Sequence, residues 1–129
     1  WLYSKSPTLE LLMGRVVNAM GKQKFGEALE LLNTVVTIAP KYAEGWNKRA
    51  TVYYLLGQFQ ASIADVERTL DLEPRHFGAL SGLGLIYNRL NREAPALDAF
   101  ERALTVNPHL EQAEAEVQRL RGKVKGKSI

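Results

Sequence analysis

The chain has 129 residues, of which 46% are hydrophobic and 24% charged, a composition that is ordinary for one folded domain and argues against disorder. It has no cysteine, so disulfide bonds and thiolate metal sites are excluded. No apolar run approaches the roughly 20 residues that cross a bilayer, and no secretory signal peptide is recognisable. Because the chain starts at Trp1 and not at methionine, we expect a processed or trimmed product. An exported (periplasmic) or organellar location therefore stays open.

The net charge of +3 is unevenly distributed along the chain. Five basic residues fall within nine positions near the C-terminus, with no acid among them: Arg119, Arg121, Lys123, Lys125 and Lys127. Without these five, the chain carries a slight excess of acidic residues. We expect the Gly- and Lys-rich end, residues 122–129, to form a flexible, solvated basic tail.

Apolar residues at helical spacing predict six helices that follow one another in three pairs. These helices are expected over residues 7–20, 25–39, 43–56, 59–72, 75–90 and 93–106. Ser6 and Pro7 suit the N-cap and the first position of a helix. Pro40 and Pro74 end the second helix of their pairs, and Gly57 is placed to take the left-handed conformation between two helices.

The last part of the chain predicts a seventh helix, over about residues 109–121. Its apolar residues Leu110, Ala113, Val117 and Leu120 share one face, whereas the opposite face is polar and charged. A helix with one apolar and one polar face is suited to cover the end of a stacked helical array. We therefore interpret this segment as a capping helix.

The helix pairs repeat with a fixed period, because Pro40, Pro74 and Pro108 are spaced by 34 residues. The third copy has Leu83-Gly84, Tyr87, Ala96 and Phe100 at the positions of a large-x2-Leu-Gly-x2-Tyr…Ala-x3-Phe…Pro pattern. The pattern resembles that of the tetratricopeptide repeat (TPR) family. Three end-to-end repeats account for residues 9–42, 43–76 and 77–110.

The second repeat departs from the family pattern at four positions. Arg49 and Ala50 stand where Leu-Gly is usual, and Ser62 and Val66 stand where Ala and Phe are usual. The first repeat is the most diverged, with Val16 where glycine is usual. The resemblance nevertheless implies an all-α, right-handed α-solenoid of three helix-turn-helix hairpins with a C-terminal capping helix.

The same resemblance implies a protein-binding scaffold, adaptor or assembly factor, whose concave groove is lined by the first helix of each hairpin. Carried over position by position, the groove residues are Met13, Val17, Met20, Asn47, Lys48, Thr51, Tyr54, Leu55, Ser81, Leu85, Asn88 and Arg89. Several of these are apolar, and an exposed apolar patch with a polar rim marks a partner site. The expected partner is another protein, which would present an amphipathic helix or an extended peptide.

Three alternatives to this groove stay open. Trp1-Leu2-Tyr3 or a flanking helix would cover part of the patch, or self-association would bury it. The runner-up function is an RNA- or ribosome-associated module that uses the basic tail, although no aromatic residues interleave with its cations for base stacking. An anionic membrane surface or an acidic partner is a further alternative for the tail, and so is a tail that serves only solubility.

One variant of the family clamps the C-terminal carboxylate of its partner with Lys, Asn and Arg side chains. The positions that would carry the clamp hold Met13, Val17, Lys48, Gly78 and Gly82 in this chain. Without paired cations a carboxylate is poorly held. We therefore predict no binding of acidic chaperone tails in that manner.

An enzymatic activity finds no support in the sequence, and no cofactor is expected. The two histidines, His76 and His109, lie at corresponding junctions between helices, where capping of the loop explains them. No HExxH pair or Gly-rich phosphate loop is present, and Gly82-x-Gly84 falls inside a predicted helix. A catalytic site would need convergent polar groups that the spacing does not supply.

Overall fold

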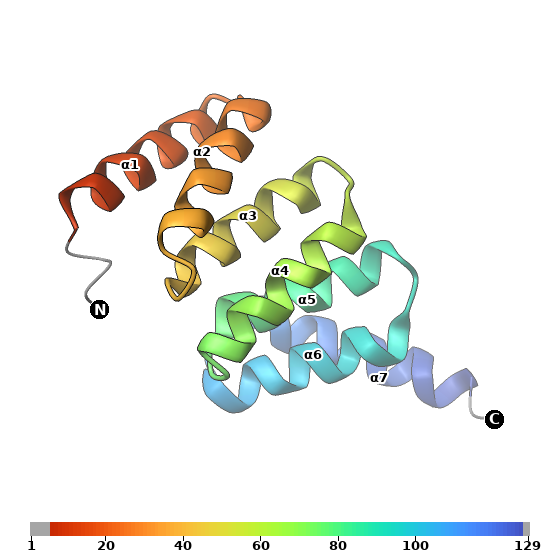
Figure 1. Cartoon of the computed structure of the whole chain (residues 1–129). Coiled ribbons are helices and arrows are strands. Elements are labelled where there is room, and N and C mark those ends of the chain that lie inside the picture. The colour runs from red at the N-terminus through yellow and green to blue at the C-terminus, as the bar shows by residue number, and fades with distance from the viewer. Residues whose placement is uncertain (1–5, 128–129) are drawn as a thin grey trace. The chain divides into compact units, whose positions relative to one another are not determined.

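The computed structural model describes residues 6–127, and within them the backbone forms seven helices and no strand (Figure 1). The helices are α1 (Pro7–Gly21), α2 (Phe25–Ile38), α3 (Ala43–Leu55), α4 (Phe59–Leu72), α5 (Phe77–Arg89), α6 (Glu93–Val106) and α7 (Glu111–Lys127). The first six begin and end within two residues of the sequence-based bounds. The all-α fold of three hairpins followed by a further helix is thus confirmed.

Local chemistry explains where the helices start and where the hairpins turn. The Ser6 hydroxyl accepts a hydrogen bond from the Leu9 N–H at 3.4 Å, as expected of an N-cap. His76 Nδ1 accepts from the Ala79 N–H at 3.0 Å, so this histidine caps α5. Each hairpin turn contains one residue with positive φ, and these residues are 34 apart: Gln23 (φ 59), Gly57 (φ 76) and Asn91 (φ 57). Gln23 was not predicted, because glutamine rarely adopts this conformation.

The chain divides into two compact units, which we call the N-terminal unit (Trp1–Leu72) and the C-terminal unit (Glu73–Ile129). The N-terminal unit contains α1–α4 and the C-terminal unit contains α5–α7. The boundary lies four residues before the expected start of the third repeat at residue 77. The assignment of residues 1–129 to a single domain stays a prediction.

The N-terminal unit is held by an apolar core to which three of its helices contribute. Its buried members are Val16 and Ala19 from α1, Ala28 and Leu32 from α2, and Val52 from α3. Because Val52 packs with residues of the first hairpin, the second hairpin is attached to the first through α3. Neither hairpin could bury its apolar surface alone, which is the reason that such repeats stack.

The C-terminal unit has its core between α6 and the two helices on either side of it. Phe100 is only 1% exposed, and it lies in a cluster with Ala96, Ala113, Val117 and Leu120. The last three belong to α7, so the predicted apolar face of this helix does cover the third hairpin. This finding supports the interpretation of α7 as a capping helix.

Glycine is required on α5 where Phe100 of α6 presses against the helix. A Cβ atom placed on Gly84 would lie 2.6–2.7 Å from three atoms of the Phe100 ring. The preceding repeats have other residues at these two positions, all of them buried: Ala50 with Val66, and Val16 with Leu32. The third repeat thus combines the smallest residue on its first helix with the largest on its second, whereas the two preceding repeats combine two aliphatic residues.

Arg49, which stands where leucine is usual, is explained by an ion pair with α4. Its guanidinium donates two hydrogen bonds to the Asp65 carboxylate, at 2.8 and 2.9 Å, and a third to Asn33 Oδ1 at 3.1 Å. It also lies over the rings of Trp46 and Tyr53, with its Cζ 5.1 and 5.6 Å from their centroids. Arg49 therefore connects α2, α3 and α4 by polar contacts where the usual leucine would pack.

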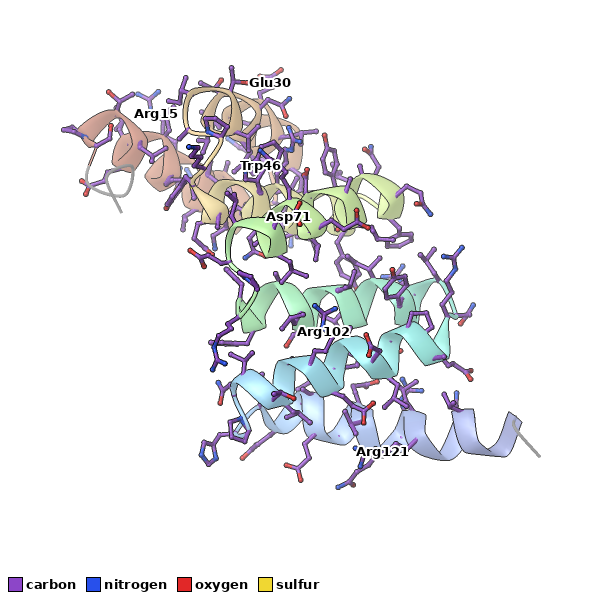
Figure 2. All side chains as sticks on the ribbon, turned by 60° about the horizontal axis from the view of Figure 1, so that its bottom comes forward. Arg15, Glu30, Trp46, Asp71, Arg102 and Arg121 are labelled. Carbon is purple, nitrogen blue, oxygen red and sulfur yellow. The ribbon has the colours of Figure 1, made fainter. Side chains whose placement is uncertain are left out.

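The expected flexible tail was wrong for residues 122–127, because α7 continues to Lys127. Gly122 and Gly126 each cost a helix about 1 kcal/mol relative to alanine, and the good helix formers Arg and Lys beside them offset part of this cost. Arg121, seen on α7 in Figure 2, is tied to Glu101 of α6 by a 2.8 Å ion pair. Residues 128–129 of the predicted tail, like Trp1-Leu2-Tyr3, lie outside the described residues.

Candidate partner-binding faces

In the N-terminal unit, three predicted groove residues lie on α1. Val17 is 56% exposed, an unusually large value for valine. Met13 and Met20 are half-buried and pack against the core cluster around Val16 and Leu32. The residues 13, 17 and 20 follow helical spacing and so share one face of α1. Val17 is the accessible residue of this face, and Met13 and Met20 beside it contact the core.

Five predicted groove residues lie on α3 of the same unit. Leu55 is 51% exposed, and Thr51 one turn before it is also exposed, whereas Asn47, Lys48 and Tyr54 are half-buried. The Thr51 hydroxyl donates to the Asn47 carbonyl at 3.1 Å, so it is satisfied within its own helix. The Tyr54 ring lies 5.8 Å from the Phe59 ring of α4, in a tilted arrangement that orients the phenol. Leu55 is the main apolar contact that α3 offers.

In the C-terminal unit, the structure places the four predicted residues in different surroundings. Ser81 and Leu85 are half-buried on one face of α5, and Arg89 at the end of this helix is exposed. Asn88 is engaged by α7: its side-chain amide donates to Glu116 Oε2 at 2.9 Å, and its Oδ1 accepts from Arg119 at 3.3 Å. Asn88 thus orients the last helix, a role that the sequence did not indicate.

The carboxylate of Glu116 is the centre of this polar contact between α5 and α7. A hydrogen bond from Arg119 lowers the pKa of Glu116 below its ordinary value, with a smaller contribution from the Asn88 amide. Burial acts in the opposite direction. Glu116 therefore remains ionised and bonded to both partners at neutral pH. Arg119 and Arg121, two of the five basic residues near the C-terminus, are both paired with acids of the C-terminal unit.

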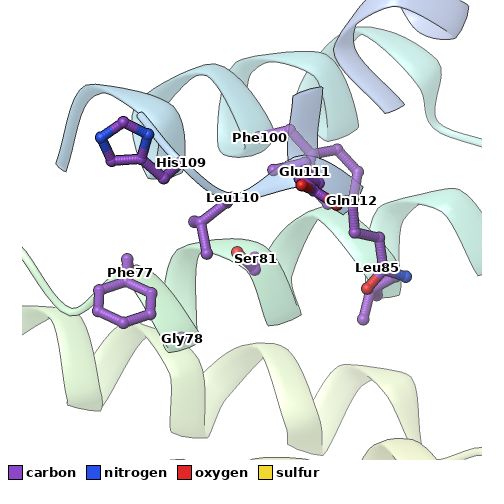
Figure 3. A pocket seen from close by; sticks show the side chains of 10 residues that line it. Phe77, Gly78, Ser81, Leu85, Phe100, His109, Leu110, Glu111 and Gln112 are labelled. Carbon is purple, nitrogen blue, oxygen red and sulfur yellow. The ribbon is translucent and has the colours of Figure 1, made fainter. Parts of the chain in front are cut away.

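A hollow of about 510 Å³ lies between α5 and the beginning of α7 (Figure 3). Its walls comprise Phe77, Gly78, Ser81 and Leu85 of α5, Phe100 of α6, and His109, Leu110, Glu111, Gln112 and Ala113. Leu110 points towards Phe77 and Ser81 in Figure 3. Of these ten residues, sequence reasoning identified Ser81 and Leu85 as site residues. We call this feature the α5–α7 hollow.

One further residue of the hollow, Phe77, could have been found from the repeat register. Phe77 is 44% exposed, and the corresponding position of the preceding repeat holds Ala43, which is buried. An exposed aromatic residue in place of a small buried one is a signal for a contact surface. Leu110, by contrast, was interpreted only as part of the capping helix.

The part of the chain that the structure describes gives little support for a metal site, a membrane-spanning helix or a histidine-based site. No group of three or more His, Asp or Glu side chains there is arranged to hold a metal ion. None of the helices between residues 6 and 127 combines the length and apolar character of a membrane span. His76 is used as a helix cap, and the His109 N–H donates to Asn107 Oδ1 at 3.1 Å.

Comparison with known proteins gives the same picture of the fold. The Sgt2 TPR domain from Aspergillus fumigatus covers 95% of this chain, and the chain covers 83% of that domain, at a TM-score of 0.86 and 21% identity. The first TPR of Spaghetti (RPAP3), bound to an HSP90 peptide, has a TM-score of 0.85 and 20% identity to this chain. The match covers 89% of this chain and 91% of the Spaghetti chain. At these identities the similarity concerns the fold.

Sequence comparison extends the similarity to the family. A TPR repeat-containing protein of Rhizobium etli is 37% identical over 126 residues, which are 98% of this chain. The chain spans 62% of the length of that relative. A profile of the tetratricopeptide repeat matches residues 47–111, about half of the chain. The chain therefore belongs to the tetratricopeptide repeat family.

Proposed function

We propose that this chain is a protein-binding module that holds a helix or an extended peptide of a partner on the first helices of its repeats. In the N-terminal unit, the binding face consists of the predicted residues of α1 and α3. In the C-terminal unit, it consists of α5 with the α5–α7 hollow. We expect such a module to act as a scaffold in the assembly of a larger complex.

The observation that carries this proposal is the exposure of large apolar side chains at the predicted positions. Val17 is 56% and Leu55 51% exposed, although both could have been polar without harm to the core. Single exposed apolar residues are common, and Leu11, Ile38 and Leu56 are others in this chain, but Val17 and Leu55 fall on the helix faces that the repeat register singles out. The half-buried Met13 and Met20 beside Val17 add an adaptable surface.

The similar folds add support for a peptide as the ligand, because the Spaghetti domain is bound to an HSP90 peptide. The prediction that this chain does not clamp an acidic C-terminal tail is maintained. Met13, at one of the clamp positions, packs against the core, and Gly78 and Gly82 have no side chain to offer a carboxylate. The ligand is therefore expected to bind by apolar contacts more than by its terminal charge.

Binding of RNA through the C-terminal basic residues ranks second. Arg119 and Arg121 already bond to Glu116 and Glu101, so they offer less positive charge to phosphates than the sequence suggested. The salt dependence separates the two functions. Phosphate-driven binding weakens steeply as salt is added, whereas apolar binding changes little.

Affinity capture with paired surface variants tests the proposed function. The double variant Val17→Ser, Leu55→Ser removes the two exposed apolar side chains and should leave helicity intact, because neither residue is buried. The control is Ile38→Ser, since Ile38 is 50% exposed but lies on α2, outside the proposed face. Proteins that co-purify with the wild type and the control, but not with the double variant, would identify the partner.

The proposal would be abandoned if the double variant captured the same proteins in the same amounts as the control. Light scattering on the wild type would show whether self-association buries the same side chains. A dimer that dissociates in the Val17→Ser, Leu55→Ser variant would make a second copy of the chain the partner.

A further inference from the structure

The α5–α7 hollow differs from the corresponding part of the preceding repeat, which gives it a chemistry of its own. Gly78, Ser81 and Leu85 occupy the positions that hold Glu44, Asn47 and Thr51 34 residues earlier. Polar and charged side chains have thus been replaced by small and apolar ones on the side of α5 that borders the hollow. The volume of about 510 Å³ is within the range of roughly 300–1,000 Å³ found for ligand sites.

Apolar walls surround most of this space. Phe77 and Leu85 contribute from α5, and Leu110 reaches in from the segment before α7 (Figure 3). The ring of Phe100 forms part of the wall and is itself fixed by contact with Gly84. An aromatic or branched aliphatic side chain that entered the hollow would bury its surface against rigid neighbours, as the anchor residues of protein interfaces do.

The charged residues at the rim of the hollow bear on which residue of the peptide would lie beside such an anchor. Glu111 is the one carboxylate among the lining residues, and it is exposed. Glu114 adds a second negative charge in the first turn of α7. On the facing helix α5, no charged residue occurs before Arg89, and Arg75, two residues before this helix, is not among the lining residues. A cation placed beside the anchor would therefore find the Glu111 carboxylate, whereas an acidic group would gain no such partner.

We propose that the α5–α7 hollow binds a bulky apolar side chain of a basic peptide segment, with an arginine or lysine of that segment next to Glu111. This inference rests on the proposed function, because it names the partner chemistry for one part of the binding face. It also distinguishes this chain from a receptor for acidic peptides such as SRMEEVD, the peptide in the Spaghetti complex.

The test uses three synthetic peptides, because the natural partner is unidentified. Each is a capped peptide of about 12 residues, long enough for an extended segment. The first has one phenylalanine between two arginines. The second replaces the phenylalanine by alanine, and the third replaces both arginines by glutamate. Binding to the full chain is followed by NMR amide shifts and by fluorescence anisotropy.

The first peptide should shift the amides of Gly78, Ser81 and Leu85 and bind at least about tenfold more tightly than the alanine peptide, as expected for an anchor residue. The glutamate peptide should bind more weakly than the first. Replacement of Glu111 by glutamine should weaken the first peptide up to about fivefold, the usual effect of one exposed charge pair. The matched control Asp98→Asn, an exposed acid of α6 outside the lining residues, should change much less.

Filling the hollow provides a second test that does not depend on charge. Ser81→Trp places a large side chain in the space and should lower the affinity for the first peptide about tenfold or more. Gln118→Trp adds the same side chain at an exposed position of α7 outside the hollow and should have no effect. If Ser81→Trp fails to fold, Phe77→Ser replaces it: this variant removes an exposed apolar side chain from the wall of the hollow and should likewise lower the affinity for the first peptide.

Preference for the glutamate peptide, or amide shifts confined to α1 and α3, would overturn the inference about the hollow. In the second case, the proposed function would survive with the N-terminal unit as its binding face. Absence of any shift at millimolar peptide would also overturn the inference. The proposed function fails separately, when the Val17→Ser, Leu55→Ser variant retains all the partners of the wild type.

Discussion

The close contact between Gly84 and Phe100 makes a prediction about stability that two neighbouring glycines can test. A Cβ atom at residue 84 would lie 2.6–2.7 Å from three atoms of the ring, about 1 Å closer than the optimum separation of carbon atoms. Phe100 is only 1% exposed and packs with Ala113, Val117 and Leu120 of α7, so the ring is confined except where it borders the α5–α7 hollow. Gly84→Ala should therefore strain the core of the C-terminal unit.

The expected magnitude follows from two opposing effects. Alanine favours the helix by about 1 kcal/mol relative to glycine, whereas overpacking a core costs about 1–3 kcal/mol. Because the clash involves three atoms of a confined ring, we expect Gly84→Ala to lower the free energy of unfolding by about 1–2 kcal/mol net. The control is Gly82→Ala, since a Cβ atom there meets nothing within 4 Å. This variant should be more stable than the wild type, by up to about 1 kcal/mol.

A third substitution tests whether the contact between residue 84 and Phe100 causes the loss of stability in Gly84→Ala. Phe100→Val should cost about 2–4 kcal/mol by leaving a cavity. Gly84→Ala, Phe100→Val reproduces the pair Ala50 and Val66 of the preceding repeat, and its loss should be smaller than the sum of the two single losses by about 1–2 kcal/mol. Urea unfolding followed by circular dichroism measures all four variants. Losses that add within about 0.5 kcal/mol, or equal stabilities of Gly84→Ala and Gly82→Ala, would refute the reasoning.

Three further predictions concern polar contacts. Asp65→Leu should lower the free energy of unfolding by about 2–3 kcal/mol, because Arg49 loses its carboxylate partner in a largely buried site. The double variant Asp65→Leu, Arg49→Leu should recover most of this loss of stability. Chemical denaturation measures the stability of both variants. The pKa of Glu116 is lowered from 4.5, so its bond to Arg119 contributes stability above that pH and loses it as the pH falls through the lowered value. Glu116→Gln should flatten this acid limb in thermal melts between about pH 3 and pH 6. His76→Ala should cost about 1 kcal/mol by removal of the α5 cap, whereas His76→Asn should retain the cap and the melting temperature.

The positions of the helices could be predicted because the sequence marks their ends by local chemistry. Ser6, Gly57 and Pro74 act through their own backbone and immediate neighbours, and the structure places them as expected. The continuation of α7 beyond Gly122 was missed, because isolated glycines such as Gly122 and Gly126 are weak helix breakers when the residues between them include good helix formers.

The candidate site was predictable only in part, because its geometry depends on residues far apart in the sequence. The repeat register directed attention to Ser81 and Leu85, which border the hollow. It gave no indication that Asn88 would be bonded to Glu116, 28 residues away. Likewise, Arg49 appeared as a departure from the family pattern until Asp65, 16 residues later, was found beside it.

The unequal residue sizes at the repeated contact positions also bear on how the chain avoids misfolding. Repeats of similar sequence risk pairing a helix with the wrong neighbour while the protein folds. If α3 paired with α6, Ala50 would be forced against Phe100; if α5 paired with α4, Gly84 would face the short Val66 and leave a void. Each mismatched hairpin would be less stable than the native one. The Gly84–Phe100 and Ala50–Val66 combinations therefore disfavour an exchange of helices between the second and third hairpins.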